Sequence, residues 1–125
     1  MIEAEKLPVR AFLLEDEEER VQWFAGQIAD LTVTADVEEA IRILESSSFD
    51  IIFMDRDLSH PEQTGEDVAW EMKERGLAPG TPVIVHSVNT RGQRVIARYL
   101  REGRQVEVIP FNELRRKSLS EVLGT

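Results

Sequence analysis

Short apolar segments alternate along this sequence with longer stretches whose apolar residues recur at helical spacing. Each apolar segment is four to six residues long, as expected for a buried strand. Strands that alternate with helices form a parallel sheet with helices on both faces, because every crossover returns to the same edge of the sheet. We therefore expect a doubly wound α/β fold with strands at residues 9–14, 31–34, 51–54, 82–85 and 106–109.

Caps and apolar spacing place five helices among these strands. The acidic run at residues 15–19 begins the first, because carboxylates in a first turn interact favourably with the helix dipole. Val21, Phe24 and Ile28 continue it at helical spacing. The remaining helices are expected after an N-cap at Asp36, from about Glu66 to Arg75 after an N-cap at Thr64, around residues 95–100, and after an N-cap at Asn112. Right-handed crossovers then favour the strand order 2-1-3-4-5.

Length and composition predict a single domain over residues 1–125. The chain is 42% hydrophobic and 31% charged, which is typical of a globular protein. It contains no cysteine, so disulfide and thiolate chemistry are excluded. The first ten residues, MIEAEKLPVR, are too polar for a secretory signal, and no apolar run approaches the roughly 18 residues that a membrane span needs. We expect a cytoplasmic protein without a membrane partner.

The charge is unevenly distributed along the chain. Residues 1–75 contain 20 acids and 7 bases, whereas residues 76–125 contain 4 acids and 8 bases, which together give the net charge of −9. This balance argues against nucleic acid as a partner. It also places the candidate site described next in the acidic part of the chain.

Polar side chains follow three of the predicted strands. In open α/β sheets, ligands bind outside the carboxyl ends of the strands, so these side chains are expected to meet at one edge. Clustered carboxylates repel one another unless a cation lies between them, and a hard divalent ion such as Mg²⁺ prefers oxygen ligands. A lone Asp after a strand usually only begins a loop, but three strand ends together favour a metal and phosphoryl site. Its candidate residues are Glu15, Asp16, Asp55, Asp57, His86 and Ser87.

The segments FLLEDEE, FDIIFMDRDL, TPVIVHS and VIPF occur in an order and spacing that resembles response-regulator receiver domains. The resemblance covers nearly the whole chain and implies a flavodoxin-like (CheY-like) fold. It also implies that Asp55 is the phosphoacceptor and that the hydroxyl of Ser87 adjusts its position to the phosphoryl group. Glu15, Asp16, Asp55 and the backbone carbonyl of Asp57 would hold Mg²⁺. Further implications are a cis peptide bond before Pro110, a role in phosphorelay, a sensor kinase or other signalling protein as partner, and a monomer or weak dimer.

Two departures from receiver domains concern the output of the signal. The family has a Lys just before the Pro that follows the fifth strand, where this chain has Ile109. Lys117 lies too far along the last helix to replace it. The family also has an aromatic switch residue on the fifth strand, for which Val106 and its neighbours cannot serve. The resemblance therefore implies phosphoryl chemistry with an atypical output switch.

The loop after Asp55 resembles that of a narrower group. Ten positions separate Asp55 from Gly65, about two more than receivers commonly have, and the chain contains D-x-D-L and H-S-x-N-x-x-G. These features are similar to cyclic-phosphate-processing receivers, although that group favours His where this chain has Arg56. This resemblance implies metal-dependent phosphodiesterase chemistry, with His86 as general acid and Arg56 or Arg91 on the phosphate. A pseudo-receiver that acts only by protein contacts is the third alternative, so the sequence leaves open whether the protein is an enzyme.

Three further features of the sequence could take part in ligand or partner binding. His60 in the long loop is a weaker candidate for function, and Trp23 and Trp70 are expected to pack rather than to stack on a ligand. Four arginines recur at steps of three and four and therefore share one helix face. Such a face is most often merely solvated, but it also suits an acidic partner or an anionic nucleotide. These arginines are Arg91, Arg94, Arg98 and Arg101.

Overall fold

The computed structural model describes residues 6–58 and 62–124. These residues form a five-stranded sheet in the order β2-β1-β3-β4-β5, and all neighbouring strands are parallel. The predicted order and direction are confirmed. The strands are β1 (Leu7–Leu14), β2 (Ile28–Thr34), β3 (Ile51–Met54), β4 (Val83–Val85) and β5 (Val106–Val108).

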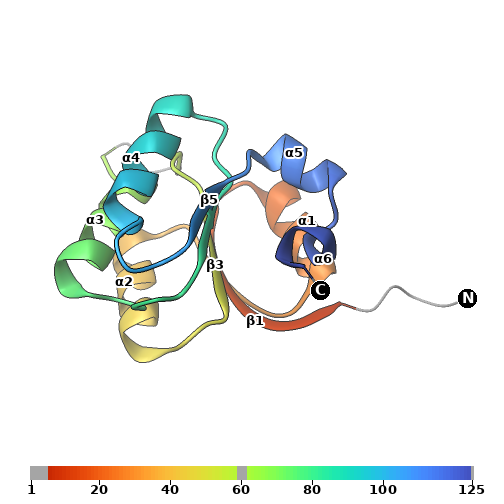
Figure 1. Cartoon of the computed structure of the whole chain (residues 1–125), viewed down its shortest axis with the longest axis horizontal. Coiled ribbons are helices and arrows are strands. Elements are labelled where there is room, and N and C mark those ends of the chain that lie inside the picture. Colours follow the sequence, from red (N-terminus) through yellow and green to blue (C-terminus); the bar gives the residue numbers. More distant parts are fainter. Residues whose placement is uncertain (1–5, 59–61, 125) are drawn as a thin grey trace, which may run out of the picture.

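Helices cover both faces of the sheet (Figure 1). One face carries α2, α3 and α4, and the other carries α1, α5 and α6. Alternation along β3 shows how the strands serve both layers, because Ile52 and Met54 pack on the first side and Ile51 and Phe53 on the second. The helices are α1 (Glu18–Gln27), α2 (Val37–Ser46), α3 (Gly65–Arg75), α4 (Thr90–Leu100), α5 (Phe111–Arg116) and α6 (Leu119–Leu123).

The prediction of one last helix is wrong, because the described residues contain six helices rather than five. Lys117 adopts an extended conformation, and the Ser118 side chain accepts a hydrogen bond from the backbone N–H of Glu121. A serine that caps a new helix in this way interrupts the preceding one. Asn112 is not the cap either, since α5 begins directly after Pro110.

Two other local predictions differ from the structure. Ile28 begins β2 instead of ending α1, because its backbone is already extended. No peptide bond among the described residues is cis, so the bond before Pro110 is trans. The trans form is the lower in energy for X–Pro bonds, by about 0.5–1 kcal/mol, and nothing in the sequence of the loop reverses this preference.

The predicted caps of the two helices that frame the third strand are confirmed. The Asp36 side chain accepts a hydrogen bond from the N–H of Glu39 at the start of α2. Thr64 and Asp67 form a reciprocal capping box at the start of α3, which fixes the direction in which the chain leaves the loop after β3. None of the helices described here is long and apolar enough to cross a membrane.

Candidate functional site

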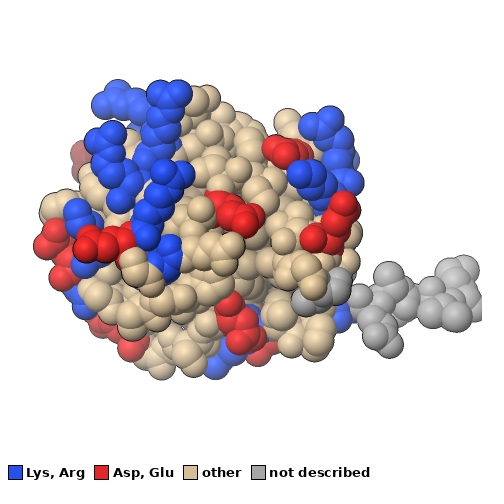
Figure 2. Space-filling model, viewed as in Figure 1, with Lys and Arg blue, Asp and Glu red and all other residues tan. Residues whose placement is uncertain are grey.

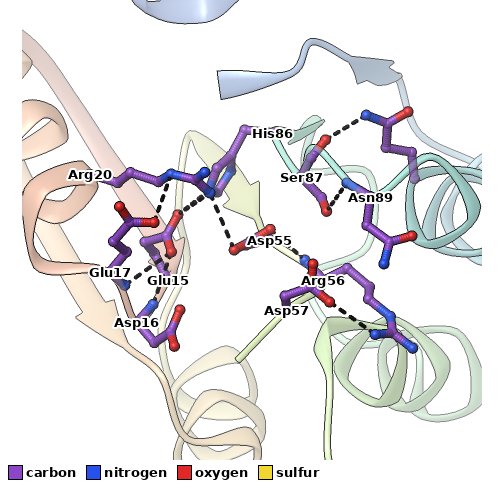
Figure 3. Close-up of polar contacts among 11 residues, drawn as sticks. Glu15, Asp16, Glu17, Arg20, Asp55, Arg56, Asp57, His86, Ser87 and Asn89 are labelled. Carbon is purple, nitrogen blue, oxygen red and sulfur yellow. Dashed lines mark hydrogen bonds and ion pairs between the residues drawn. The ribbon is translucent and has the colours of Figure 1, made fainter. Parts of the chain in front are cut away.

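The carboxyl ends of β1, β3 and β4 bring three titratable side chains together (Figure 3). Glu15, Asp55 and His86 each offer a ligand atom, and these atoms lie within 4.8 Å of one another. The three residues retain only 2%, 3% and 0% of their exposed surface, respectively. Burial of two carboxylates in contact range costs free energy unless cations or hydrogen bonds compensate their charge. The partners of each carboxylate therefore decide what this site can do.

Glu15 is almost completely satisfied by its neighbours. Its Oε1 lies 2.9 Å from Nε2 of His86, and its Oε2 accepts hydrogen bonds of 3.1 Å from the backbone N–H groups of Asp16 and Glu17. Burial by itself raises the pKa of Glu15, but the hydrogen bond and charge of His86, together with the Glu17 N–H and Arg20, outweigh it, so the pKa lies below its ordinary value. Glu15 is therefore an ionised carboxylate held in one orientation.

Asp55 is less completely compensated. Its Oδ1 accepts a hydrogen bond of 2.8 Å from the backbone N–H of Arg56. Its Oδ2 lies 3.7 Å from the guanidinium of Arg20, which is too long for a hydrogen bond. Burial raises the pKa of Asp55 to about 6; the charge of His86 opposes this rise, and the charge of Glu15 adds to it. One oxygen of Asp55 is thus fixed by the backbone, and the other faces a cation across a gap.

Arg20 on α1 was not predicted as part of the site. Its side chain, with 18% of its surface exposed, approaches Glu15 at 3.7 Å and Glu17 at 3.3 Å in addition to Asp55. Its guanidinium carbon also lies 5.0 Å from the centre of the Phe111 ring. The available signal in the sequence was a single base at the end of the acidic run of residues 15–19, one turn into the helix.

The side chain of Asp57 points away from Asp55 (Figure 3). It forms an ion pair of 2.9 Å with Arg56, which also pairs with Glu66 on α3 at 2.7 Å. The Asp57 side chain is thus engaged with Arg56 at the exposed rim, and its backbone carbonyl stays a predicted metal ligand. Arg56 in turn serves as a clamp between the loop after β3 and α3.

The N-terminus of α3 approaches the site closely at Gly65. A Cβ atom built on this residue would lie 1.9 Å from the carbonyl oxygen of Asp55, so the position accepts only glycine without a backbone shift. The N–H of Gly65 donates a hydrogen bond of 2.8 Å to the carbonyl of Arg56. Gly65 therefore holds the loop after the candidate phosphoacceptor against α3.

Ser87 lies at the end of β4 and is fully buried. Its Oγ accepts a hydrogen bond of 3.1 Å from the N–H of Asn89, which also caps α4 through the N–H of Gly92. The motif H-S-x-N-x-x-G is thus a β4–α4 connection in which serine and asparagine fix the turn and the helix start. Gly92 of the motif is closely packed, because a Cβ there would lie 2.3 Å from Cγ of Arg56 and would force the Arg56 side chain to move.

The other candidates lie away from the three buried groups. Ile109 is partly buried and packs against the core cluster on the α1 and α5 side of the sheet, and Lys117 pairs with Glu113 on the exposed side of α5. Arg91 is exposed on α4, and no hydrogen bond or ion pair links it to Glu15 or Asp55 among the described residues. His60 lies outside the described residues. His86 and Arg20, rather than a lysine at position 109, are therefore the potential cations beside the carboxylates.

The donor set suits a hard divalent cation. Glu15 and Asp55 bring carboxylate oxygens within 4.8 Å of one another and of a ring nitrogen of His86. Asp16 and the backbone carbonyl of Asp57 are the further oxygen ligands that the resemblance implies. The incomplete compensation of Asp55, whose pKa is raised to about 6, is what a bound cation would relieve. These residues consequently fit Mg²⁺, which the resemblance implied.

Several solved receiver domains share this architecture. The receiver domain of the sensor histidine kinase PA1611 from Pseudomonas aeruginosa, which has a magnesium ion in its active-site cleft, is 20% identical over 94% of this chain and 95% of its own, with a TM-score of 0.71. The phosphorylated cyanobacterial phytochrome response regulator RcpA is 19% identical over 92% and 93%, with a TM-score of 0.64. The receiver domain of the Francisella response regulator 1452 is 20% identical over 86% and 88%, with a TM-score of 0.58. At these identities the likeness establishes the fold.

The sequence itself establishes the family. The model of the cyclic-phosphate processing receiver domain matches residues 10–102, which include β1, β3, β4 and the candidate site. The chain belongs to this family of receiver domains, and the predicted resemblance is confirmed. None of the curated proteins that were compared with the sequence matches it.

Proposed function

We propose that this receiver domain, spanning residues 1–125, binds Mg²⁺ and accepts a phosphoryl group on Asp55. The observation that carries the proposal is the asymmetry of the Asp55 carboxylate, with Oδ1 bound to the Arg56 N–H and Oδ2 facing Arg20 without a hydrogen bond. A buried carboxylate whose second oxygen accepts no hydrogen bond from the described residues, and has only a long ion pair to Arg20, is a suitable nucleophile, since little has to be displaced before it attacks. Glu15, Asp16, Asp55 and the Asp57 carbonyl would hold the metal.

The transfer step follows from this geometry. Oδ2 of Asp55 attacks the phosphorus of an acyl phosphate or a comparable donor, and a new Oδ2–P bond forms. The bond from phosphorus to the leaving oxygen of the donor breaks, and that oxygen keeps the electron pair. Bound Mg²⁺ would offset the charge of the attacking carboxylate and of the phosphoryl oxygens. Asp55 must be ionised, so we expect the rate to rise as the pH passes through its pKa, which lies at about 6 without metal.

The output of such a receiver would differ from the ordinary switch. Ile109 supplies no charge, and Val106 and Val108 on β5 are too small to act as an aromatic switch. We propose that Ser87, at the end of β4 and bonded to the start of α4, carries the change of state toward α4. The partner would be a sensor kinase or another signalling protein of the cytoplasm.

Processing of a cyclic phosphate is the second candidate. The family match and the H-S-x-N-x-x-G turn favour it. The same metal would activate water, but His86 is fully buried behind Glu15. In this version His86 would act through Glu15, as the group that orients the carboxylate, rather than as an acid in direct contact with the substrate.

One experiment separates the two candidates. The Mg²⁺-loaded protein is offered acetyl phosphate and, in parallel, a set of cyclic nucleotides, and both products are followed by mass spectrometry. A gain of one phosphoryl group that stops at one and is lost in Asp55→Asn supports the phosphoacceptor. Steady turnover of a cyclic substrate supports the second candidate and overturns the first. If neither product forms, the remaining interpretation is a pseudo-receiver that acts by protein contacts.

A further inference from the structure

β5 of this chain carries no positively charged side chain that could contact a phosphoryl group on Asp55. Ile109, directly after β5, stands where receiver domains have their lysine, and its uncharged side chain packs against the core. Lys117 is held by Glu113 on the surface. A phosphoryl group carries a larger negative charge than the carboxylate that accepts it, so its burial requires a cationic partner from elsewhere in the fold.

Arg20 is positioned to be that partner. It comes from α1, and Figure 3 shows it on the opposite side of Asp55 from Arg56, with its guanidinium next to Glu15 and Glu17. Glu17 at 3.3 Å and the ring of Phe111 at 5.0 Å hold the guanidinium from two sides. Both contacts are independent of Asp55 and therefore fix the guanidinium before any phosphoryl group arrives.

The distance between Arg20 and Asp55 leaves room for Arg20 to bind a phosphoryl group rather than the carboxylate itself. At 3.7 Å the guanidinium stops short of a hydrogen bond to Oδ2, the oxygen that is free to react. A phosphoryl group bonded to Oδ2 extends beyond the carboxylate, so its oxygens move toward the guanidinium. A planar guanidinium can then donate two hydrogen bonds to two phosphoryl oxygens.

We propose that Arg20 is the phosphoryl-binding residue of this domain and takes over the electrostatic role that a β5 lysine cannot fill here. The inference rests on the proposed phosphorylation of Asp55 and names the residue that recognises the phosphoryl group. It moves the contact from β5 to α1 and, through the Phe111 ring, to the start of α5.

Arg20→Gln tests the proposal with two measurements of opposite sign. Loss of a charged hydrogen-bond donor should lower the phosphorylation rate with acetyl phosphate and the affinity for beryllofluoride, a phosphoryl mimic, by about 10- to 100-fold. The same variant should bind Mg²⁺ about 3- to 10-fold more tightly in titration calorimetry, because a positive charge beside the metal has been removed. A variant that is merely damaged would lose both affinities.

Two further variants complete the design. Arg115→Gln makes the same change of charge at an exposed arginine on α5 and should leave both affinities within about twofold of the wild-type values. Ile109→Lys added to Arg20→Gln restores a cation on β5 and should recover a substantial part of beryllofluoride binding. Unchanged beryllofluoride affinity in Arg20→Gln would overturn the inference while leaving the phosphoacceptor intact. Absence of phosphorylation in the wild-type protein would instead overturn the proposed function, and the inference with it.

Discussion

The molecule carries two clusters of like charge, one acidic and buried, the other basic and exposed to solvent. The acidic cluster, Glu15 with Asp55, lies at the carboxyl edge of the sheet with 2% and 3% of its surface exposed. The arginine stripe lies on α4 and its C-cap, where its side chains extend into solvent at the upper left of Figure 2. None of its four members forms an ion pair with a described residue. These are Arg91, Arg94, Arg98 and Arg101, all exposed.

The difference shows where charge repulsion acts on the fold. Water screens the arginines, so their spacing on a helix face costs little. The carboxylates have lost that screening and depend on His86, on Arg20 and on backbone N–H groups. Asp55 has fewer of these partners than Glu15, and burial raises its pKa to about 6. The least compensated charge therefore lies at Asp55, the residue that we propose as the phosphoacceptor.

The largest expected effect concerns the charge of Asp55 itself. Because its pKa is raised in the folded state, the native protein holds this proton more tightly than the unfolded chain does. Stability should therefore fall as the pH rises from about 4 to about 6 and then level off. Asp55→Asn removes the ionisation, and without metal it should be more stable than the wild type by about 3 kcal/mol at pH 8 and by less than about 1 kcal/mol at pH 4.

Urea unfolding in the presence of a chelator measures both values. Addition of Mg²⁺ should stabilise the wild type and leave the Asn variant nearly unchanged, because a ligand stabilises only the state that binds it. Equal stabilities of the two proteins at pH 8 would show that the partners of Asp55 fully compensate its charge. The acidic cluster would then cost the fold no more than the solvated arginine stripe does.

A second test compares crowding at the site with open space at the surface. Gly65→Ala forces a Cβ against the Asp55 carbonyl and should destabilise the protein by about 2 to 3 kcal/mol. The matched control is Gly26→Ala in α1, where no atom lies within 4 Å of the added Cβ, and it should stabilise by about 0.5–1 kcal/mol. Thermal unfolding of both variants gives the comparison, and a mild effect at Gly65 would mean that the loop after β3 yields readily.

The helix caps should not distinguish the two regions. Thr64→Ala removes a cap of α3 beside the acidic cluster, and Asn89→Ala removes the cap of α4, which carries the stripe. Each should cost about 1 kcal/mol in denaturant unfolding. A much larger loss for Asn89 would indicate that its side-chain cap to the N–H of Gly92 also holds the turn between β4 and α4.

The smallest effect is expected on the arginine stripe. Arg94 and Arg98 lie four residues apart, so Arg98→Gln relieves a repulsion and should raise stability by about 0.2–0.5 kcal/mol at low salt. The gain should vanish at about 1 M salt, where the Debye length is about 3 Å. A marked destabilisation in differential scanning calorimetry would mean that the stripe is not simply solvated.

The sequence predicted the face with α2, α3 and α4 more completely than the other face. Long helices with clear caps at Asp36 and Thr64 leave few alternatives. On the other face, the apolar spacing at the end of the chain predicts one continuous helix. Ser118 interrupts it because its side chain hydrogen-bonds to the backbone N–H of Glu121, and apolar spacing does not reveal that bond. Strand order followed from alternation, because right-handed crossovers permit few topologies.

The site was predictable only in part for a related reason. The positions of Glu15, Asp55, His86 and Ser87 at strand ends follow from the order of the strands, and the structure brings the first three together. Their roles in metal binding and phosphoryl transfer stay predictions. Arg20 lies on a helix, so its approach to Asp55 depends on the angle at which α1 packs, which no local pattern specifies.

The stacking around Phe111 also gives the protein an optical probe of its own. Trp23 lies edge-on to Phe111 at 5.5 Å, and Phe111 is the ring over which the Arg20 guanidinium rests. Any movement of that guanidinium changes the field at the indole. The second tryptophan, Trp70, lies on α3 with 44% of its surface exposed and contacts Tyr99. Trp70 lies on the opposite face of the sheet from Trp23, so Trp70→Phe would leave Trp23 as the single tryptophan. Its emission would then report the movement of Arg20 that the proposed phosphorylation of Asp55 predicts.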